Sequence, residues 1–133
     1  VVFCSGKVYY DLVKERRDRG INDVAILRVE QLYPWPRLRV MAEISRYSNA
    51  EVVWCQEEPA NMGGWMFVLP RLTNILDELK RDQRVPVYAG RKASASPATG
   101  LLKTHEAEQR QLVEHALATA IDAIPQPFRR PVS

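Results

Sequence analysis

Residues 1–20 read VVFCSGKVYYDLVKERRDRG and contain one complete strand–loop–helix unit. Residues 1–4 form a short apolar run, which predicts a buried strand. From Lys7 to Arg19 the apolar residues recur at helical spacing, and Gly20 provides a stop signal for the helix. The unit therefore predicts a strand inside a sheet, followed by an amphipathic helix that packs on it.

The same pattern recurs three more times along the chain. We expect strands at residues 24–29, 51–55 and 85–89, and helices at residues 38–47, 68–79 and 104–121. Pro86 places the last strand at a sheet edge or marks its beginning. Pro70 suggests that the third helix begins only there, and Thr104 is the expected N-cap of the last helix. Strands that alternate with helices predict an α/β domain with a parallel sheet covered on both faces.

Composition supports one globular domain and argues against several other classes. The chain has 133 residues, 46% of them hydrophobic and 26% charged, which is enough apolar surface to fold. It carries 19 Lys and Arg against 16 Asp and Glu, with the two signs interleaved, so we expect no nucleic-acid partner. It has no apolar run of membrane-spanning length and no signal peptide, so we expect no membrane association. The chain begins directly on a strand, as expected for a fragment.

Domain boundaries follow from the same survey. We expect one domain over residues 1–124 and a flexible tail over residues 125–133, which has three prolines and two arginines. Cys4 and Cys55 lie in apolar runs, which indicates buried free thiols in a reducing compartment. No metal site is expected, because the two histidines do not stand at zinc-ligand spacing from the cysteines.

Candidate functional residues follow the strands, where ligands and partners of parallel sheets gather. The candidate interface residues in these strand-edge loops are Lys7, Glu57, Glu58, Asn61, Gly63, Trp65, Arg91, Ser94 and Ser96. Near the second helix, Gln31, Arg37 and Arg39 could bind an anion through charge-assisted hydrogen bonds, or the arginines could be solvated. An independent module that binds a phosphorylated metabolite or nucleotide is therefore an alternative function.

No catalytic residue is assigned from these patterns. Glu57 and Glu58 are adjacent in an extended segment, so their side chains should point to opposite faces and not form an acid–base pair. One of them could cap the next helix while the other forms a salt bridge. A small hydrolase that uses Cys55 with His105, or the two glutamates, is the remaining alternative; Cys55 inside a strand indicates an inert thiol.

Four segments resemble a known family in the same order and spacing. They are CSGKVYY at 4–10, RVEQLYP at 28–34, WCQEEPANMGGW at 54–65 and GRKASASPATG at 90–100. The chain resembles, from residue 1 to about residue 117, the C-terminal domain of the thiamine-diphosphate-dependent dehydrogenase component of the 2-oxoglutarate dehydrogenase complex. The resemblance implies a three-layer α/β/α sandwich with a mainly parallel sheet, as in transketolase C-terminal domains, and a further strand upstream of Val1.

The resemblance also implies a function for the whole parent enzyme. A homodimer would decarboxylate 2-oxoglutarate in the tricarboxylic acid cycle and pass the succinyl group to a lipoyl acyltransferase partner. Thiamine diphosphate and Mg²⁺ would be held by preceding domains and not by this one, which would serve as a structural and interface domain. The expected location is the bacterial cytoplasm, or the mitochondrial matrix in a eukaryote.

Regulation is the last property that the resemblance implies. Some relatives bind acetyl-CoA or a nucleotide such as AMP beside this domain. The matching positions are Gln31 and Arg39, with Arg37 close by. Leu38 stands where a second arginine is expected, which is a departure from the pattern of these relatives.

Overall fold

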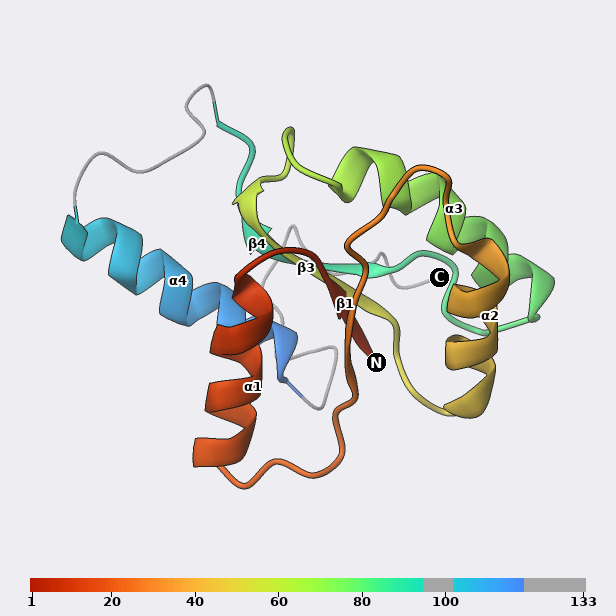
Figure 1. The fold of residues 1–133 in the computed structure, drawn as a ribbon, viewed down its shortest axis with the longest axis horizontal. Coiled ribbons are helices and arrows are strands. Elements are labelled where there is room, and N and C mark those ends of the chain that lie inside the picture. Colours follow the sequence, from red (N-terminus) through yellow and green to blue (C-terminus); the bar gives the residue numbers. More distant parts are fainter. Residues whose placement is uncertain (95–101, 119–133) are drawn as a thin grey trace.

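Four strands alternate with four helices in the computed structural model, which describes residues 1–94 and 102–118 (Figure 1). The elements are β1 (Val2–Cys4), α1 (Val8–Asp18), β2 (Ile26–Arg28), α2 (Arg37–Arg46), β3 (Val53–Pro59), α3 (Trp65–Glu78), β4 (Val87–Arg91) and α4 (Leu102–Ala116). Each predicted strand and helix is present. Among the described residues, no helix has the length and apolar character needed to cross a membrane.

The four strands form one parallel sheet in the order β2–β1–β3–β4. Val2 is in register with Ile26 of β2 and with Val53 of β3, and Val53 is in register with Val87 of β4. The parallel α/β prediction is confirmed. The edge position of β4, with Pro86 immediately before it, is confirmed as well.

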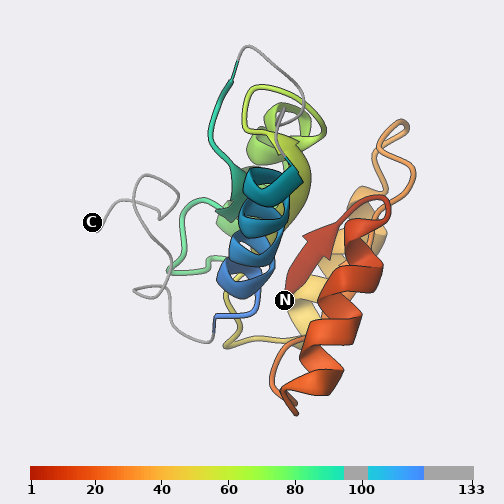
Figure 2. The same cartoon turned by 90° about the vertical axis from the view of Figure 1, so that its left-hand side faces the viewer.

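Helices cover both faces of the sheet, in three layers (Figures 1 and 2). Cys4 and Cys55 point toward α1 and α4, where Leu12 and Leu112 complete one buried cluster. Their strand neighbours point to the other face because side chains alternate along a strand. There Phe3 and Trp54 pack with residues of α2 and α3 such as Ile44 and Leu72.

Several element boundaries differ from the sequence prediction. β3 continues past Cys55 to Pro59, where it pairs with Arg91 across an irregularity in register. α3 begins at Trp65 and not at Pro70, which lies inside the helix at an exposed position. α4 begins at Leu102, so Thr104 lies within its first turn and is not the N-cap. The buried positions predicted in α4 are confirmed as far as Leu117, whereas residues 120 and 121, the domain end at 124 and the tail lie outside the described residues.

Candidate functional site

The carboxyl ends of the strands meet at one edge of the sheet, and those predicted interface residues that the structure describes lie there. The structure brings Lys7, Glu57 and Arg91 into one polar cluster, and it brings Asn61 into contact with Ser94. Ser96 lies outside the described residues. Of the predicted anion-binding residues, Arg37 and Arg39 lie at the beginning of α2, and Gln31 lies in the loop between β2 and α2.

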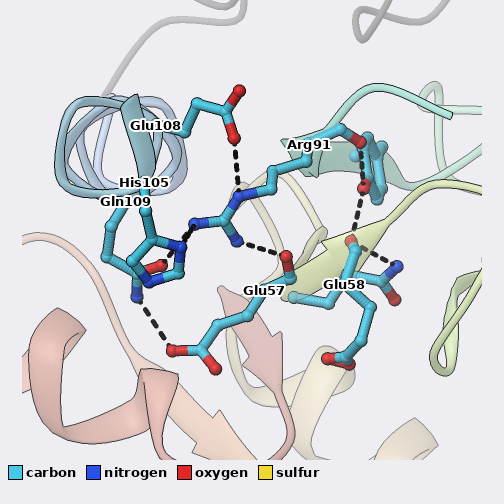
Figure 3. Close-up of polar contacts among 8 residues, drawn as sticks. Glu57, Glu58, Arg91, His105, Glu108 and Gln109 are labelled. Carbon is cyan, nitrogen blue, oxygen red and sulfur yellow. Dashed lines mark hydrogen bonds and ion pairs between the residues drawn. The ribbon is translucent and has the colours of Figure 1, made fainter. Parts of the chain in front are cut away.

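Arg91, at the end of β4, is the centre of the polar cluster (Figure 3). Its Nη1 donates to the backbone carbonyl of Glu57, and its Nε donates to Glu108 Oε2 at 2.9 Å. Its Nη2 donates to Gln109 Oε1 at 3.0 Å and contacts His105 Nδ1 at 3.4 Å. The Arg91 side chain is only 9% exposed. A buried guanidinium with charged and neutral acceptors on all sides fixes the geometry of its neighbours, so Arg91 joins α4 to the ends of β3 and β4.

The Glu57 carboxylate extends this cluster to α1. Gln109 donates from Nε2 to Glu57 Oε1 at 2.9 Å and to Asp11 Oδ2 at 2.8 Å. The Lys7 ammonium lies 3.9 Å from the same Glu57 oxygen, but it is 80% exposed, so this ion pair is weak. One glutamine therefore connects α4, β3 and α1 at the carboxyl edge.

Glu58 lies on the opposite side of β3, as the alternation of side chains predicts. An added Cβ on Gly63 would lie 2.7 Å from Glu58 Oε2, so this carboxylate faces the loop before α3 and not the Arg91 cluster. Figure 3 shows the two carboxylates pointing apart. They do not form an acid–base pair, and the glutamate that forms the predicted salt bridge is Glu57, with Lys7.

Gln56 is the most buried polar residue of the site, and it is not among the residues predicted from the sequence. It is 1% exposed, and its Oε1 accepts hydrogen bonds from Trp54 Nε1 and from the Trp65 backbone N–H, both at 2.8 Å. Its Nε2 lies within 3.1 Å of the carbonyl oxygens of residues 58, 59 and 62. The amide thus organises the whole turn from β3 into α3. A polar residue that directly follows an apolar strand segment was the signal for this role.

A second pair of loops is joined by Asn61. Its Nδ2 donates to the Ser94 carbonyl at 2.8 Å, and its Oδ1 accepts from the Ser94 backbone N–H at 3.0 Å. The Asn61 amide thus donates to and accepts from the backbone of one residue, as paired residues in a sheet do. Trp65 supports the same region, because its ring packs 4.9 Å from that of Tyr88, centroid to centroid. The strand-edge loops after β3 and β4 are therefore held together.

Two effects favour glycine at position 63, namely the left-handed backbone and the close contact with Glu58. A matched control, Gly20→Ala, separates them. Gly63 and Gly20 both have left-handed backbones, with φ of +65° and +63°, but only Gly63 has a close neighbour, Glu58. We expect Gly20→Ala to lower the free energy of unfolding by about 1 kcal/mol, from backbone strain alone. Gly63→Ala should cost about 2 kcal/mol, because Glu58 must also move. Urea unfolding measures both, and equal losses would show that the Glu58 contact is unimportant.

A further cluster joins the loop after β1 to the end of β2. Glu30 Oε1 accepts the Gly6 backbone N–H and Arg28 Nε, both at 3.1 Å. These bonds, first the one from Gly6, lower the pKa of Glu30. The Arg28 guanidinium also lies over the rings of Tyr9 and Tyr10, at 5.0 and 5.5 Å. This cluster was not predictable from the sequence, since its residues come from separate elements.

The predicted anion-binding residues have different surroundings in this structure. Arg37 pairs with Glu78 and donates to Asn74 Oδ1 at 3.2 Å, so it faces α3. Arg39 is exposed, and Leu38 between them is 78% exposed. The Gln31 side chain donates only a long bond, of 3.4 Å, to its own loop. Arg37 is therefore paired with a protein carboxylate at the surface, where its side chain stays 37% exposed, whereas Arg39 is exposed to solvent.

The two cysteines are buried and do not form a nucleophilic site. Cys4 and Cys55 are register partners on β1 and β3, and both are fully inaccessible. Burial raises the pKa of Cys4 to about 12, and it raises the pKa of Cys55 well above the ordinary value. His105 contacts Arg91, in the polar cluster. The structure therefore gives no support to a hydrolase based on Cys55.

The raised thiol pKa predicts a loss of stability at alkaline pH. A thiol that is harder to ionise in the folded state favours folding below its ordinary pKa of 9.0, and this advantage disappears as pH rises toward about 12. Urea midpoints at neutral pH and at pH about 10 should show the decrease. Cys4→Ala removes one of these titrations and should give a shallower decrease; an unchanged slope would contradict the assignment.

The site as a whole orders loops. Its carboxylates, amides and guanidinium groups bond mainly to one another, and no group of three His, Cys, Asp or Glu side chains within residues 1–94 and 102–118 could hold a metal ion.

Comparison with known proteins shows which family this chain belongs to. The sequence matches the family described as "2-oxoglutarate dehydrogenase C-terminal" over residues 1–117. Proteins named "2-oxoglutarate dehydrogenase E1 component" from Brucella anthropi, Brucella ovis and Brucella canis are each 55% identical over 117 residues. The matched region is 88% of this chain but only 12% of the length of each relative. The chain thus belongs to the 2-oxoglutarate dehydrogenase C-terminal family.

Proposed function

We propose that this chain is the C-terminal domain of a 2-oxoglutarate dehydrogenase E1 component and serves there as a structural and interface domain. The observation that carries the proposal is the 55% identity over 117 residues to proteins of that name. The geometry is consistent with it. Arg91, Gln56 and Gln109 use their polar atoms to hold loops together, so they do not offer a free acid, base or nucleophile.

The reaction of the parent enzyme is part of the proposal. The parent would be a homodimer that decarboxylates 2-oxoglutarate and passes the succinyl group to a lipoyl acyltransferase partner, as a step of the tricarboxylic acid cycle. Thiamine diphosphate would supply the carbanion chemistry of decarboxylation. The family resemblance is the reason for placing it and its Mg²⁺ in the preceding domains of the parent. The parent would act in the bacterial cytoplasm or in the mitochondrial matrix.

The contribution of this chain to that reaction would be positional. Arg91 and Gln109 hold α4 against the ends of β3 and β4, and Asn61 holds the loop of residues 92–94 against the loop before α3. Residues fixed in this way keep a neighbouring domain in one orientation without large entropic cost. No proton or group transfer is assigned to this chain.

The test compares this chain with its parent polypeptide. CO₂ release from 2-oxoglutarate is measured with thiamine diphosphate and Mg²⁺ present. We expect turnover by the parent and none by residues 1–133 alone. CO₂ release by this chain alone, abolished by changing Glu57, would overturn the assignment and give this chain a catalytic role of its own.

A regulatory role is the finer part of the proposal. Acetyl-CoA or AMP would bind near Gln31 and Arg39, of which Arg39 is exposed and available. Arg37 would first have to leave Glu78. Binding of each nucleotide to the parent is measured by calorimetry, with Arg39→Ala as the test variant and the exposed Arg19→Ala as its matched control. We expect loss of binding in Arg39→Ala only. Equal binding by both variants would refute the proposed effector site.

A further inference from the structure

The loop between β2 and α2 contains the one buried side-chain polar atom, among residues 1–94 and 102–118, that has no hydrogen-bond partner. This atom is Nε1 of Trp35, whose N–H is inaccessible to solvent although the residue as a whole is only partly buried. A buried donor without an acceptor loses its hydration and gains no bond in return, so it disfavours the conformation that buries it. The position of Trp35 in this structure therefore has an unfavourable contribution that exposure of the indole would remove.

Apolar contacts hold the loop in this position. The Trp35 ring packs edge to face with that of Phe67 in the first turn of α3, at 6.2 Å between ring centroids. Leu32 lies against Gly64, where an added Cβ would be 3.1 Å from Leu32 Cδ1. Trp35 and Leu32 are therefore the anchors of the loop on the beginning of α3, and the burial of their apolar surface opposes the cost of the unpaired N–H.

Hydrogen bonds add little to these anchors. Within the described part of the chain, the hydrogen bonds of residues 31–36 reach only the segment itself and the first turn of α2. The tip of the loop is in solvent, where Tyr33 is 85% exposed. A segment held by two apolar anchors and by local hydrogen bonds opens at a low free-energy cost compared with unfolding of the whole domain.

The two ends of this segment are fixed. On one side, Val29 is 7% exposed and its N–H donates to the Cys4 carbonyl at 2.8 Å. On the other side, Arg37 pairs with Glu78 and donates to Asn74 Oδ1 at 3.2 Å, which joins the beginning of α2 to α3. Opening would therefore be confined to the loop before α2, which projects from the domain (Figures 1 and 2).

We propose that residues 31–36 form a strap that opens and closes over the beginning of α3, with Trp35 as its latch. The closed strap, seen in this structure, buries its apolar anchors and leaves the indole N–H unpaired. In the open strap the indole is hydrated, and Gly64 loses the cover of Leu32. A molecule that offers an oxygen acceptor to the indole only in the open position would shift the population toward it. The inference concerns contacts within this chain, so it does not depend on the proposed function.

Hydrogen exchange of the indole N–H groups tests the proposal on this chain. Its three tryptophans give separate indole signals in two-dimensional NMR spectra, which single replacements by phenylalanine assign. Trp54 is the reference, because it is 1% exposed and its Nε1 donates to Gln56 Oε1 at 2.8 Å. We expect the Trp35 N–H to exchange about a hundredfold faster than that of Trp54, at a rate that low urea concentrations do not change, since local opening exposes little surface. Equal rates with equal dependence on urea, as a water molecule held permanently against the indole would produce, would overturn the proposal.

A matched pair of leucine variants shows whether Trp35 moves alone or with the whole strap. Leu32→Ala weakens the second anchor, so the Trp35 N–H should exchange about tenfold faster while the exchange rate of Trp54 changes less than about twofold. Leu38→Ala is the control, because Leu38 lies just outside the strap and is 78% exposed, and it should leave both rates unchanged. An unchanged Trp35 rate in Leu32→Ala would refute a strap, and an equal acceleration at Trp35 and Trp54 would refute local opening.

Discussion

Arg91→Ala is expected to lower the free energy of unfolding by about 3 kcal/mol, since removal of the guanidinium leaves buried polar groups without a hydrogen-bond partner. The guanidinium is only 9% exposed and holds Glu57, Glu108 and Gln109 together. Its loss should also free the N-terminal half of α4. Urea unfolding of this chain measures the change.

A matched exposed arginine provides the control for this prediction. Arg19 is 49% exposed and lies 3.9 Å from Glu15, so Arg19→Ala should cost less than about 0.5 kcal/mol. Arg91→Lys should fall between the two variants, because a lysine keeps the charge but not the planar set of donors. An Arg91→Ala loss as small as that of Arg19→Ala would show that the polar cluster does not hold the carboxyl edge.

Gln56→Leu is expected to cost still more, about 3–5 kcal/mol, because several buried groups lose their partner at once. The leucine has a similar volume, so packing changes little. Trp54 Nε1 and the Trp65 backbone N–H would be left without the acceptor that they share. Chemical unfolding again gives the measurement, with tryptophan fluorescence as the probe.

Two comparisons make the Gln56 prediction specific. Gln31 is exposed, so Gln31→Leu should change the free energy of unfolding by less than about 0.5 kcal/mol. Adding Trp54→Phe to Gln56→Leu removes the indole N–H that the single variant leaves without an acceptor. The double variant should therefore lose less free energy of unfolding than the sum of the two single changes. Simple additivity would indicate that the indole–amide bond contributes little.

The sequence predicted the order of elements because local periodicity determines it. Apolar runs of four to six residues separated by amphipathic segments are sufficient for a parallel sheet covered by helices. The opposite orientations of Glu57 and Glu58 also followed from the two-residue period of a strand. These features depend on neighbours in the chain, which a single sequence contains.

The features that the sequence did not predict come from contacts between distant residues. Arg91 meets Glu57, and Arg37 meets Glu78, only after the elements pack. β3 continues to Pro59 because β4 pairs with it there, and no local signal marks that pairing. The occupation of Arg37 by a carboxylate likewise could not be read from spacing alone. Site geometry in this domain is therefore a property of the packed sheet edge.

A chimaeric enzyme tests the central claim most directly. The matched C-terminal segment of the Brucella anthropi E1 component is replaced by residues 1–117 of this chain, and CO₂ release from 2-oxoglutarate is measured with thiamine diphosphate and Mg²⁺. We expect the chimaera to be active and the same enzyme without the segment to be inactive. A truncated enzyme that keeps full activity, or CO₂ release by this chain alone, would contradict the account.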